Sequence, residues 1–220
     1  MKIAILNFPG TSSLEETKFA LDDLGYKSEI LWHKQDKVDA DLVILPSGAS
    51  YGNYLRPAAI AKHSPIINSL LDHAKKGGYI VGISDGFQLL LELGLLPGAT
   101  NQNINLKCIS KFQHFKVASN SNKLLSRCKV GEVLNMPISS AYANYYLDSS
   151  ILPKIWDKEQ VLLTYCDAFG NDNNPNGSVD NIAGVCDENK KIFGFMPQPQ
   201  RANDEILGSS DGIKILKGFL

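Results

Sequence analysis

One short stretch of the chain, Gly82-Ile-Ser-Asp-Gly86, holds a hydroxyl side chain between two glycines at a predicted strand-to-helix turn. The residues leading into it, 79–83, are mostly apolar and predict a buried strand, because parallel strands covered on both faces need no alternation. The residues after it, 87–91, repeat apolar side chains at helical spacing. A sharp turn of this kind projects its side chain at the carboxyl end of a sheet, where the helix amino terminus offers unpaired N–H groups to a developing oxyanion. Ser84 is therefore the first candidate nucleophile.

The motif fits the G-x-S-x-G elbow of serine hydrolases, which also requires a histidine base later in the chain and an acid between the two. Of the four histidines only His114 follows Ser84, and it falls inside a strand-like segment. The carboxylates between them, Asp85 and Glu92, are too close to the serine in sequence to complete such a triad. Since a serine hydroxyl without a base is a poor nucleophile at neutral pH, the sequence argues against serine hydrolysis.

Alternating strand and helix patterns place this turn in an α/β sheet. Ser12 and Glu15 form a capping-box signature ahead of the first helix. The loop Pro46–Gly52 follows the third strand, where doubly wound proteins place ligand loops. This order of elements predicts an open, largely parallel sheet with crossover helices. In this half of the chain, strands are expected at 2–6, 28–32, 41–45 and 79–83, and helices at 14–24 and 66–74.

The pattern changes after Pro97-Gly98, where short strand-like runs alternate with polar turns. A long loop is expected at 167–181, which is rich in Asn, Asp and Gly, and a short helix at 212–220. The chain shows no internal repeat, linker or low-complexity tail, so residues 1–220 are predicted to form a single domain. The expected strands of this half are 105–109, 114–118, 130–138, 161–165, 182–185 and 192–196.

The composition excludes several classes of function. A formal net charge of −1 argues against binding to nucleic acid or to an anionic membrane. No apolar run reaches the ~18–20 residues of a membrane span and the first residues read as a strand, so a cytoplasmic location is expected. The four cysteines are far apart without a Cys-x-x-Cys spacing, which disfavours zinc and a disulfide framework. We expect neither a metal nor a cofactor.

A series of motifs along the whole chain resembles class I, triad-type glutamine amidotransferases. The closest resemblance is to the glutaminase subunits of phosphoribosylformylglycinamidine synthase, in purine biosynthesis. Segments such as Ser-Tyr-Gly-x-Tyr-Leu-Arg and Asn-Pro-Asn-Gly-Ser are specific to this subunit within the superfamily. The motifs are Phe8–Gly10, Ser50–Arg56, Gly86–Gln88, Leu95–Ala99, Asn144–Tyr146, Asn174–Ser178, Asn181–Gly184, Met196–Ala202 and Ser210–Gly212.

The resemblance implies a flavodoxin-like fold with a Cys-His-Glu triad, in which the cysteine forms a thioester with glutamine and the released ammonia passes to a synthetase. The implied partner is the large synthetase subunit, with the small accessory protein of the same enzyme being a further candidate. By the same resemblance, the oxyanion and substrate pocket maps to Gly48, Ala49, Asp85, Gln88, Ser140 and Tyr142. Candidate partner-surface residues are Tyr51, Tyr54, Arg56, Asn174 and Asn176.

The departures from the family lie at the triad itself. Ser84 stands at the position of the cysteine, and Gln198 and Gln200 stand at the positions of the histidine and glutamate. Gln198 has no titratable nitrogen, so it can neither accept a proton from Ser84 nor donate one to leaving ammonia. The family's His-Gly-Glu-Gly beside the pocket is replaced by Ser140–Ala143, and Ser47 replaces the first glycine of the oxyanion loop.

These substitutions predict a degenerate subunit that keeps a structural or regulatory role with the synthetase and lacks intrinsic glutaminase activity. Two alternatives stay open at this point. One is a binding protein that reuses the former glutamine pocket for another small ligand, with Ser84, Asp85, Gln198 and Gln200 supplying hydrogen bonds. The other is a subunit that still hydrolyses glutamine and supplies ammonia.

Overall fold

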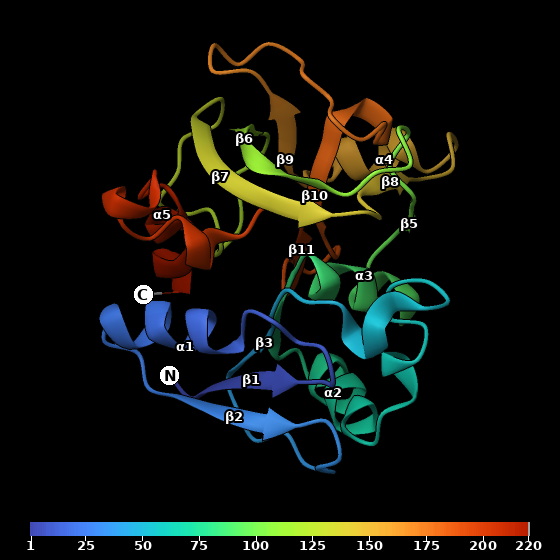
Figure 1. The fold of residues 1–220 in the computed structure, drawn as a ribbon, viewed down its shortest axis with the longest axis vertical. Coiled ribbons are helices and arrows are strands. Elements are labelled where there is room, and N and C mark those ends of the chain that lie inside the picture. Colours follow the sequence, from blue (N-terminus) through green and yellow to red (C-terminus); the bar gives the residue numbers. More distant parts are fainter. Residues whose placement is uncertain (220) are drawn as a thin grey trace.

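A sheet of nine strands runs through the molecule in the order β2-β1-β3-β4-β11-β10-β9-β6-β7 (Figure 1). A computed structural model of the chain describes residues 1–219. The first five strands in this order are parallel to one another, and the last four continue the sheet with antiparallel pairing. The parallel strands are β1 (Ile3–Asn7), β2 (Ser28–Trp32), β3 (Leu42–Leu45), β4 (Tyr79–Ile83) and β11 (Ile192–Phe195).

The antiparallel half comprises β6 (Ile109–Val117), β7 (Val133–Ser140), β9 (Val161–Cys166) and β10 (Ile182–Cys186). A separate ribbon pairs β5 (Ala99–Asn101) with β8 (Asn144–Tyr146). The helices are α1 (Leu14–Asp23), α2 (Ile66–Lys75), α3 (Asp85–Glu92), α4 (Leu152–Asp157) and α5 (Gly212–Leu216). Figure 1 shows α1 and α5 on one side of the strands and α2 and α3 on the other. All residues of β3, β9, β10 and β11 are buried, as expected for strands that are covered on both faces.

The predicted fold class is confirmed, and the strands expected at 28–32 and 79–83 have those bounds. The strand expected at 105–109 is wrong, since β6 begins only at Ile109 and the preceding residues form a loop. The capping box is also wrong: Ser13 is the N-cap of α1, and its hydroxyl donates to the Ser47 carbonyl oxygen at 3.0 Å instead of capping the helix. Of the helix expected at 212–220, α5 covers the first five residues, a 3₁₀ turn follows at Lys217–Phe219, and residue 220 lies outside the described part. The short elements β5, β8 and α4 had no counterpart in the sequence analysis.

None of the helices in residues 1–219 is long and apolar enough to cross a membrane.

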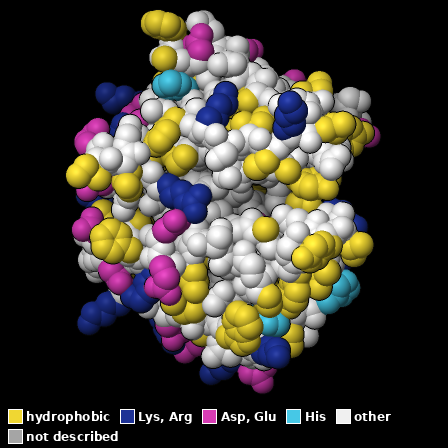
Figure 2. Space-filling model, in the orientation of Figure 1, with side chains coloured by type: hydrophobic (Ala, Val, Ile, Leu, Met, Phe, Trp, Pro, Cys, Tyr) yellow, Lys and Arg dark blue, Asp and Glu magenta, His cyan; other side chains and the backbone are white. Residues whose placement is uncertain are grey.

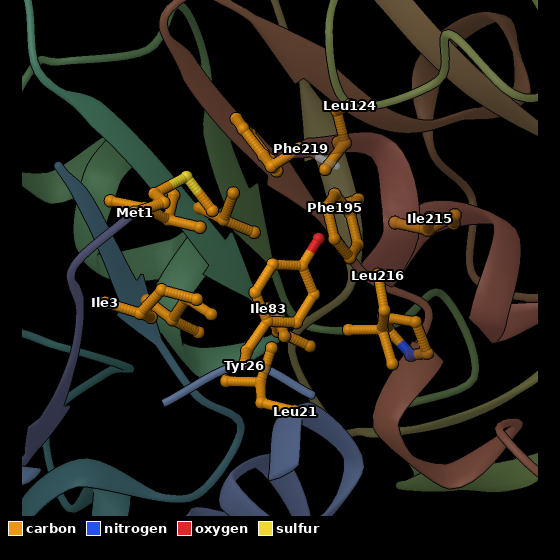
Figure 3. A pocket seen from close by; sticks show the side chains of 14 residues that line it. Met1, Ile3, Leu21, Tyr26, Ile83, Leu124, Phe195, Ile215, Leu216 and Phe219 are labelled. Atoms are coloured by element: carbon orange, nitrogen blue, oxygen red, sulfur yellow. The ribbon is translucent and has the colours of Figure 1, made fainter. Parts of the chain in front are cut away.

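A small apolar cavity of about 20 Å³ lies where α1 and the C-terminal segment cover the parallel strands (Figure 3). It is lined by apolar side chains such as Ile3, Leu21 and Phe195, together with Tyr26. The Tyr26 hydroxyl is buried without a hydrogen-bond partner, and burial raises the pKa of its phenol. A polar atom in such surroundings loses its bonds to water and gains none in return.

We therefore expect Tyr26→Phe to be neutral or to raise the free energy of unfolding by up to about 1 kcal/mol. The matched control is Tyr165→Phe, because the buried Tyr165 hydroxyl accepts a hydrogen bond from Asn176 Nδ2 at 2.9 Å. Removing that partner is expected to destabilise the fold by about 1–2 kcal/mol. Equilibrium urea unfolding measures both changes, and a clear loss of stability in Tyr26→Phe would contradict the assignment of an unsatisfied hydroxyl.

Candidate functional site

The strand-to-helix turn between β4 and α3 has the strained backbone of a nucleophile elbow. Ser84 is the N-cap of α3 with φ 52° and ψ −102°, a conformation that a residue with a side chain rarely adopts. Its N–H donates to the Phe195 carbonyl oxygen at 2.8 Å, which fixes the turn to the adjacent strand β11. The side chain is buried, with 2% of its surface exposed. The sequence-predicted elbow is thus present in the structure.

The two glycines of the motif are needed because backbone segments approach closely here. A Cβ on Gly86 would lie 2.1 Å from the Leu45 carbonyl oxygen, and a Cβ on Gly82 would lie 2.6 Å from the Gly86 carbonyl oxygen. Contacts this short are excluded for any side chain, so α3 can begin at this place only with glycine at both positions. The elbow is therefore built from packing between β3, β4 and α3.

The loop after β3 packs against the loop after β1 at Gly10 and Gly48. A Cβ on Gly10 would lie 2.3 Å from the Ala49 carbonyl oxygen, and one on Gly48 would lie 2.6 Å from the Gly10 carbonyl oxygen. The Ala49 N–H donates to the Gly10 carbonyl oxygen at 2.9 Å, so this amide is committed and does not face an oxyanion. The Gly48 N–H makes no hydrogen bond within residues 1–219, and the Asp85 N–H lies in the first turn of α3 without an acceptor inside the helix. Among the residues predicted to donate to an oxyanion, Gly48 and Asp85 therefore have a free backbone N–H within residues 1–219, and Ala49 does not.

Gln198 and Gln200 follow β11 and flank the first residue of a short 3₁₀ turn, Pro199–Arg201. Both side chains are 2% exposed. Gln200 Nε2 donates to Ser47 Oγ at 3.3 Å, and Ser47 Oγ donates to Ser13 Oγ at 2.7 Å. The side-chain oxygens of Gln198 and Gln200 are buried and have no hydrogen-bond partner. The structure therefore connects Gln200 with Ser47 of the loop after β3.

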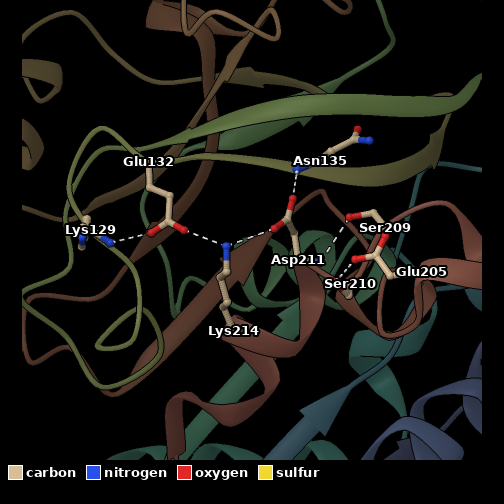
Figure 4. Close-up of polar contacts among 8 residues, drawn as sticks. All are labelled: Lys129, Glu132, Asn135, Glu205, Ser209, Ser210, Asp211 and Lys214. Carbon is tan, nitrogen blue, oxygen red and sulfur yellow. Dashed lines mark hydrogen bonds and ion pairs between the residues drawn. The ribbon is translucent and has the colours of Figure 1, made fainter.

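Helix α5 holds this segment in place. The Gly212 N–H donates to the Ala202 carbonyl oxygen at 2.7 Å, and a Cβ on Gly212 would lie 2.1 Å from the Pro199 carbonyl oxygen. Figure 4 shows how α5 is joined to β7: Lys214 Nζ lies 2.7 Å from a Glu132 oxygen, and Asp211 accepts from the Asn135 N–H at 2.9 Å. Two independent contacts thus fix the glutamine-bearing turn between α5 and the sheet.

A cavity of about 340 Å³ is lined by Gln198 and by the loops after β1 and β3. Figure 2 shows a hollow near the centre of one face of the molecule. The wall of the cavity contains the predicted site residues Gly48, Ala49, Gln88, Ser140 and Gln198. Gln88 Nε2 donates to the Tyr142 carbonyl oxygen and, at 3.4 Å, to Ser140 Oγ. Tyr142 contributes this carbonyl, while its hydroxyl accepts a hydrogen bond from Gln102 at 3.2 Å. The cavity wall also contains residues that were not predicted from the sequence, among them Asn53, Cys108 and Arg201.

The sequence marks these three residues to different degrees. Asn53 lies inside the motif Ser50–Arg56 that supports the family resemblance, so its position near the site could have been predicted from the sequence. Cys108 is exposed, whereas the other three cysteines are buried, and no pattern in the sequence distinguishes it from them. Arg201 forms a two-bond ion pair with Glu16 of α1, with distances of 2.6 and 3.1 Å, and no sequence pattern predicts that pairing.

Asp85, the residue after the elbow serine, is a buried carboxylate tied to the oxyanion loop. One of its oxygens accepts hydrogen bonds from Ser50, from the N–H at 3.1 Å and from the hydroxyl. The other oxygen is buried without a partner. Burial raises the pKa of Asp85, and the two donors of Ser50 oppose that shift only in part.

The candidate partner-surface residues separate into exposed and internal ones. Tyr54 is 88% exposed, and Arg56 is exposed while it pairs with Glu92 at 2.6 Å. Tyr51 is half-buried, and its hydroxyl lies 3.1 Å from His33 Nδ1. Asn176 was expected on the partner surface, but it is fully buried. Its side chain donates to the Ala143 carbonyl oxygen at 2.8 Å and so supports the fold. Asn174 donates to the Ser178 carbonyl oxygen at 2.7 Å within the same loop.

The remaining reactive groups offer little chemistry. Burial raises the pKa of the Cys128 and Cys166 thiols to about 11 and that of Cys186 to about 12, which keeps all three protonated at neutral pH. Within the described part of the chain, no three His, Cys, Asp or Glu side chains come together as metal ligands. None of these thiols supplies a base for the elbow serine.

Comparison with known proteins agrees with this fold. The sequence profile of the CobB/CobQ-like glutamine amidotransferase domain matches residues 1–211. The chain therefore belongs to this family of glutamine amidotransferases. Over its full length it is 52% identical to phosphoribosylformylglycinamidine synthase subunit PurQ of Campylobacter jejuni and covers 96% of that protein. It is 50% identical to the PurQ subunit of Sulfurimonas denitrificans, of which it covers 99%.

Solved structures give the same result. A chain in the structure of PurLQS from Thermotoga maritima superposes with a TM-score of 0.90 at 33% identity, covering 99% of this chain and 96% of that one. A further glutamine amidotransferase from Thermotoga maritima matches with a TM-score of 0.60 at 13% identity, covering 92% of this chain and 77% of that one, which shows the common fold alone. The resemblance to PurQ-like class I glutamine amidotransferases is thus confirmed.

The buried carboxylate predicts a pH-dependent effect of Asp85→Asn. Because the folded-state pKa of Asp85 is raised, folding favours its protonated form. The penalty for the ionised form is absent below the unfolded pKa of about 3.9 and grows as the pH rises through the folded pKa. We expect Asp85→Asn to raise the urea midpoint at about pH 8 and to have little effect at about pH 4.

The control is Asp36→Asn, which changes an exposed aspartate and is expected to leave the stability unchanged at both pH values. A stability gain of equal size at both ends of the pH range would contradict the role of ionisation.

Proposed function

We propose that the chain is a PurQ-like subunit that associates with the synthetase of phosphoribosylformylglycinamidine synthase and does not hydrolyse glutamine. The relatives named PurQ support the association, as does the similarity to a chain in the PurLQS structure. The observation that carries the second part is the pair of buried glutamines, Gln198 and Gln200, at the positions of the family's histidine and glutamate.

A proton acceptor for the elbow serine is missing from the described residues. Ser84 Oγ makes no hydrogen bond to a side chain within residues 1–219, and no histidine lines the cavity in that part. Asp85, the next residue in the chain, is bound to Ser50 through one carboxylate oxygen, and burial raises its pKa and so favours its neutral form. A serine hydroxyl needs a base that is close and ready to accept its proton, so this arrangement supports loss of the first chemical step.

The scaffold of the site is nevertheless intact. The strained elbow, the glycine contacts with Leu45 and the close packing of Gly10 on Gly48 are all present. Such a subunit would bind the synthetase and keep its ammonia entry closed or stabilise the larger protein. The synthetase would then use free ammonia or ammonia from another source.

A binding protein of a different class is the second candidate, and the cavity of about 340 Å³ favours it, because buried side-chain oxygens there have no partner. Purification distinguishes the two. A stable complex with a large synthetase supports the subunit, whereas an isolated monomer that carries a small molecule supports the binder.

We expect the purified chain to release no more ammonia from glutamine than its Gln198→Ala variant, both alone and with the cognate synthetase. The reason is that no titratable group at position 198 can shuttle the proton. A coupled glutamate assay under both conditions checks this. Glutamine hydrolysis that depends on the synthetase and falls in Gln198→Ala would show that the chain is still an active glutaminase.

The intact elbow predicts that the chemistry can be restored. The triple variant Ser84→Cys, Gln198→His, Gln200→Glu is expected to gain synthetase-dependent glutaminase activity, because the elbow at position 84 and the turn that carries positions 198 and 200 are both formed. The matched control carries Ser84→Cys alone and is expected to stay inactive, since a thiol without its base and orienting acid lacks two of three catalytic groups.

Two exposed apolar side chains in the motif Ser50–Arg56 predict a partner contact. Tyr54 is 88% and Leu55 71% exposed, and exposed large apolar residues beside a site mark interaction surfaces. We expect Tyr54→Ser with Leu55→Ser to weaken binding to the synthetase at least about tenfold, measured by calorimetry. Phe169→Ser is the control, because Phe169 is 90% exposed on a loop of the antiparallel half. Equal weakening by both variants would contradict the assignment.

A further inference from the structure

An open groove of about 680 Å³ lies between α1, the strands β6 and β7, and the turn that precedes α5. Several large apolar side chains in its wall are exposed to solvent: Phe19 is 67%, Phe112 42% and Leu207 49% exposed. Large exposed apolar side chains that share one groove mark a contact with another molecule. The apolar residues of the wall are Phe19, Phe112, Pro137 and Leu207.

The fold holds these apolar side chains in place. Phe112 of β6 pairs with Pro137 of β7, and its ring packs on Gly208, where a Cβ would lie 3.1 Å from the ring. Leu207 ends the 3₁₀ turn Glu205–Leu207, which is capped by the Asp204 side chain accepting from the Ile206 N–H at 2.9 Å. The groove is therefore formed before anything binds in it, which lowers the entropy cost of docking.

Carboxylates dominate the charged groups around the groove. Glu15 and Glu16 line it from α1, and Arg201 is the only cation among the described residues of its wall. Arg201 already pairs with Glu16, whereas Glu15 forms no ion pair within residues 1–219. The turn before α5 adds Asp204 and Glu205, which are exposed and likewise form no ion pair in that part of the chain. A partner that complements this rim carries basic side chains beside its apolar anchor.

The groove adjoins the candidate site. Arg201 lines both the groove and the cavity of about 340 Å³, and Gln200 of the groove donates to Ser47 in the cavity wall at 3.3 Å. The same cavity is lined by Asn53, which belongs to the motif Ser50–Arg56 with its exposed apolar side chains. A single partner that covers the cavity is therefore placed to contact both this motif and the groove.

We infer that the groove receives a segment of the synthetase in which an apolar side chain is flanked by lysine or arginine. The apolar side chain packs against Phe19 and Leu207, and the flanking cation pairs with Glu15. The inference rests on the proposed association with the synthetase, to which it adds a second contact surface and the chemistry of the segment that binds there.

Calorimetry with the synthetase subunit alone tests the apolar contact. We expect Phe19→Ser to raise the Kd at least about tenfold, because the anchor side chain loses its aromatic partner. The matched control is Phe169→Ser, since Phe169 is 90% exposed on a loop of the antiparallel half and lies outside the groove wall. Phe19 is exposed on α1, and the urea midpoint checks that the variant folds. An unchanged Kd in Phe19→Ser, or equal weakening by the control, would overturn the inference.

A charge reversal tests the basic flank. Glu15→Lys is expected to raise the Kd and to make it less sensitive to salt, because an attractive rim charge becomes a repulsive one. Asp36→Lys makes the same change of charge at an exposed aspartate outside the groove and is expected to leave both quantities unchanged. A Kd in Glu15→Lys that equals that of the control at low salt would overturn the inference.

Photo-crosslinking identifies the occupant. A photoreactive phenylalanine derivative in place of Phe19 is expected to join, on illumination of the complex, to a synthetase peptide with an apolar residue next to lysine or arginine. Mass spectrometry reads the joined peptide. Crosslinking to a second copy of this chain, or to a synthetase peptide without basic residues, would overturn the inference.

The proposed function and this inference fail in different experiments. A chain that binds no synthetase, or that releases ammonia from glutamine in its presence, contradicts the proposed function. Tight association that persists unchanged in Phe19→Ser contradicts the inference alone.

Discussion

The close approach of the α3 amino terminus to β3 is the constraint on which the site depends. With glycine at position 86, the first turn of α3 packs directly on the Leu45 carbonyl, and with glycine at position 82, β4 reaches this turn without a clash. The same packing forces Ser84 into a backbone conformation with positive φ. Because these contacts involve backbone atoms, they do not depend on whether the side chain at position 84 is a thiol or a hydroxyl.

The two halves of the sheet differ in how far the sequence predicts them. The parallel strands are short apolar runs, most of them buried on both faces, and residues 28–32 and 79–83 have the expected bounds because glycine or polar turns limit them on each side. The strands of the antiparallel half are harder to predict. The residues of β6 from Ser110 to Phe112 are exposed, so hydropathy does not locate the start of this strand. The ribbon of β5 and β8 consists of three-residue strands, which are too short for any periodic pattern.

The site shows a similar division. The positions of Ser84, Gln198 and Gln200 follow from motifs, and the structure brings the last of these against Ser47 of the oxyanion loop. The commitment of the Ala49 amide to Gly10 and the pairing of Arg201 with Glu16 join segments far apart in the chain. Such contacts are decided by the packing of loops in three dimensions, so no local pattern in the sequence records them. The burial of Asn176 illustrates the same limit, since its motif gave no sign of whether it faces solvent or the interior.

The strained backbone of Ser84 has a consequence for how such a protein changes over time. A non-glycine residue held in so sparsely populated a conformation costs about 1–3 kcal/mol, and in an active enzyme the aligned nucleophile gives a reason to retain that cost. On the proposed function this benefit is gone, yet the glycines at 82 and 86 and the strand beneath them permit no relaxed alternative. Side chains at positions 198 and 200 can be exchanged one at a time, whereas the elbow can change only if several elements move together. On the proposed function, the backbone of the site therefore outlasts its chemistry, and the strain that remains at Ser84 is a physical trace of an ancestral reaction.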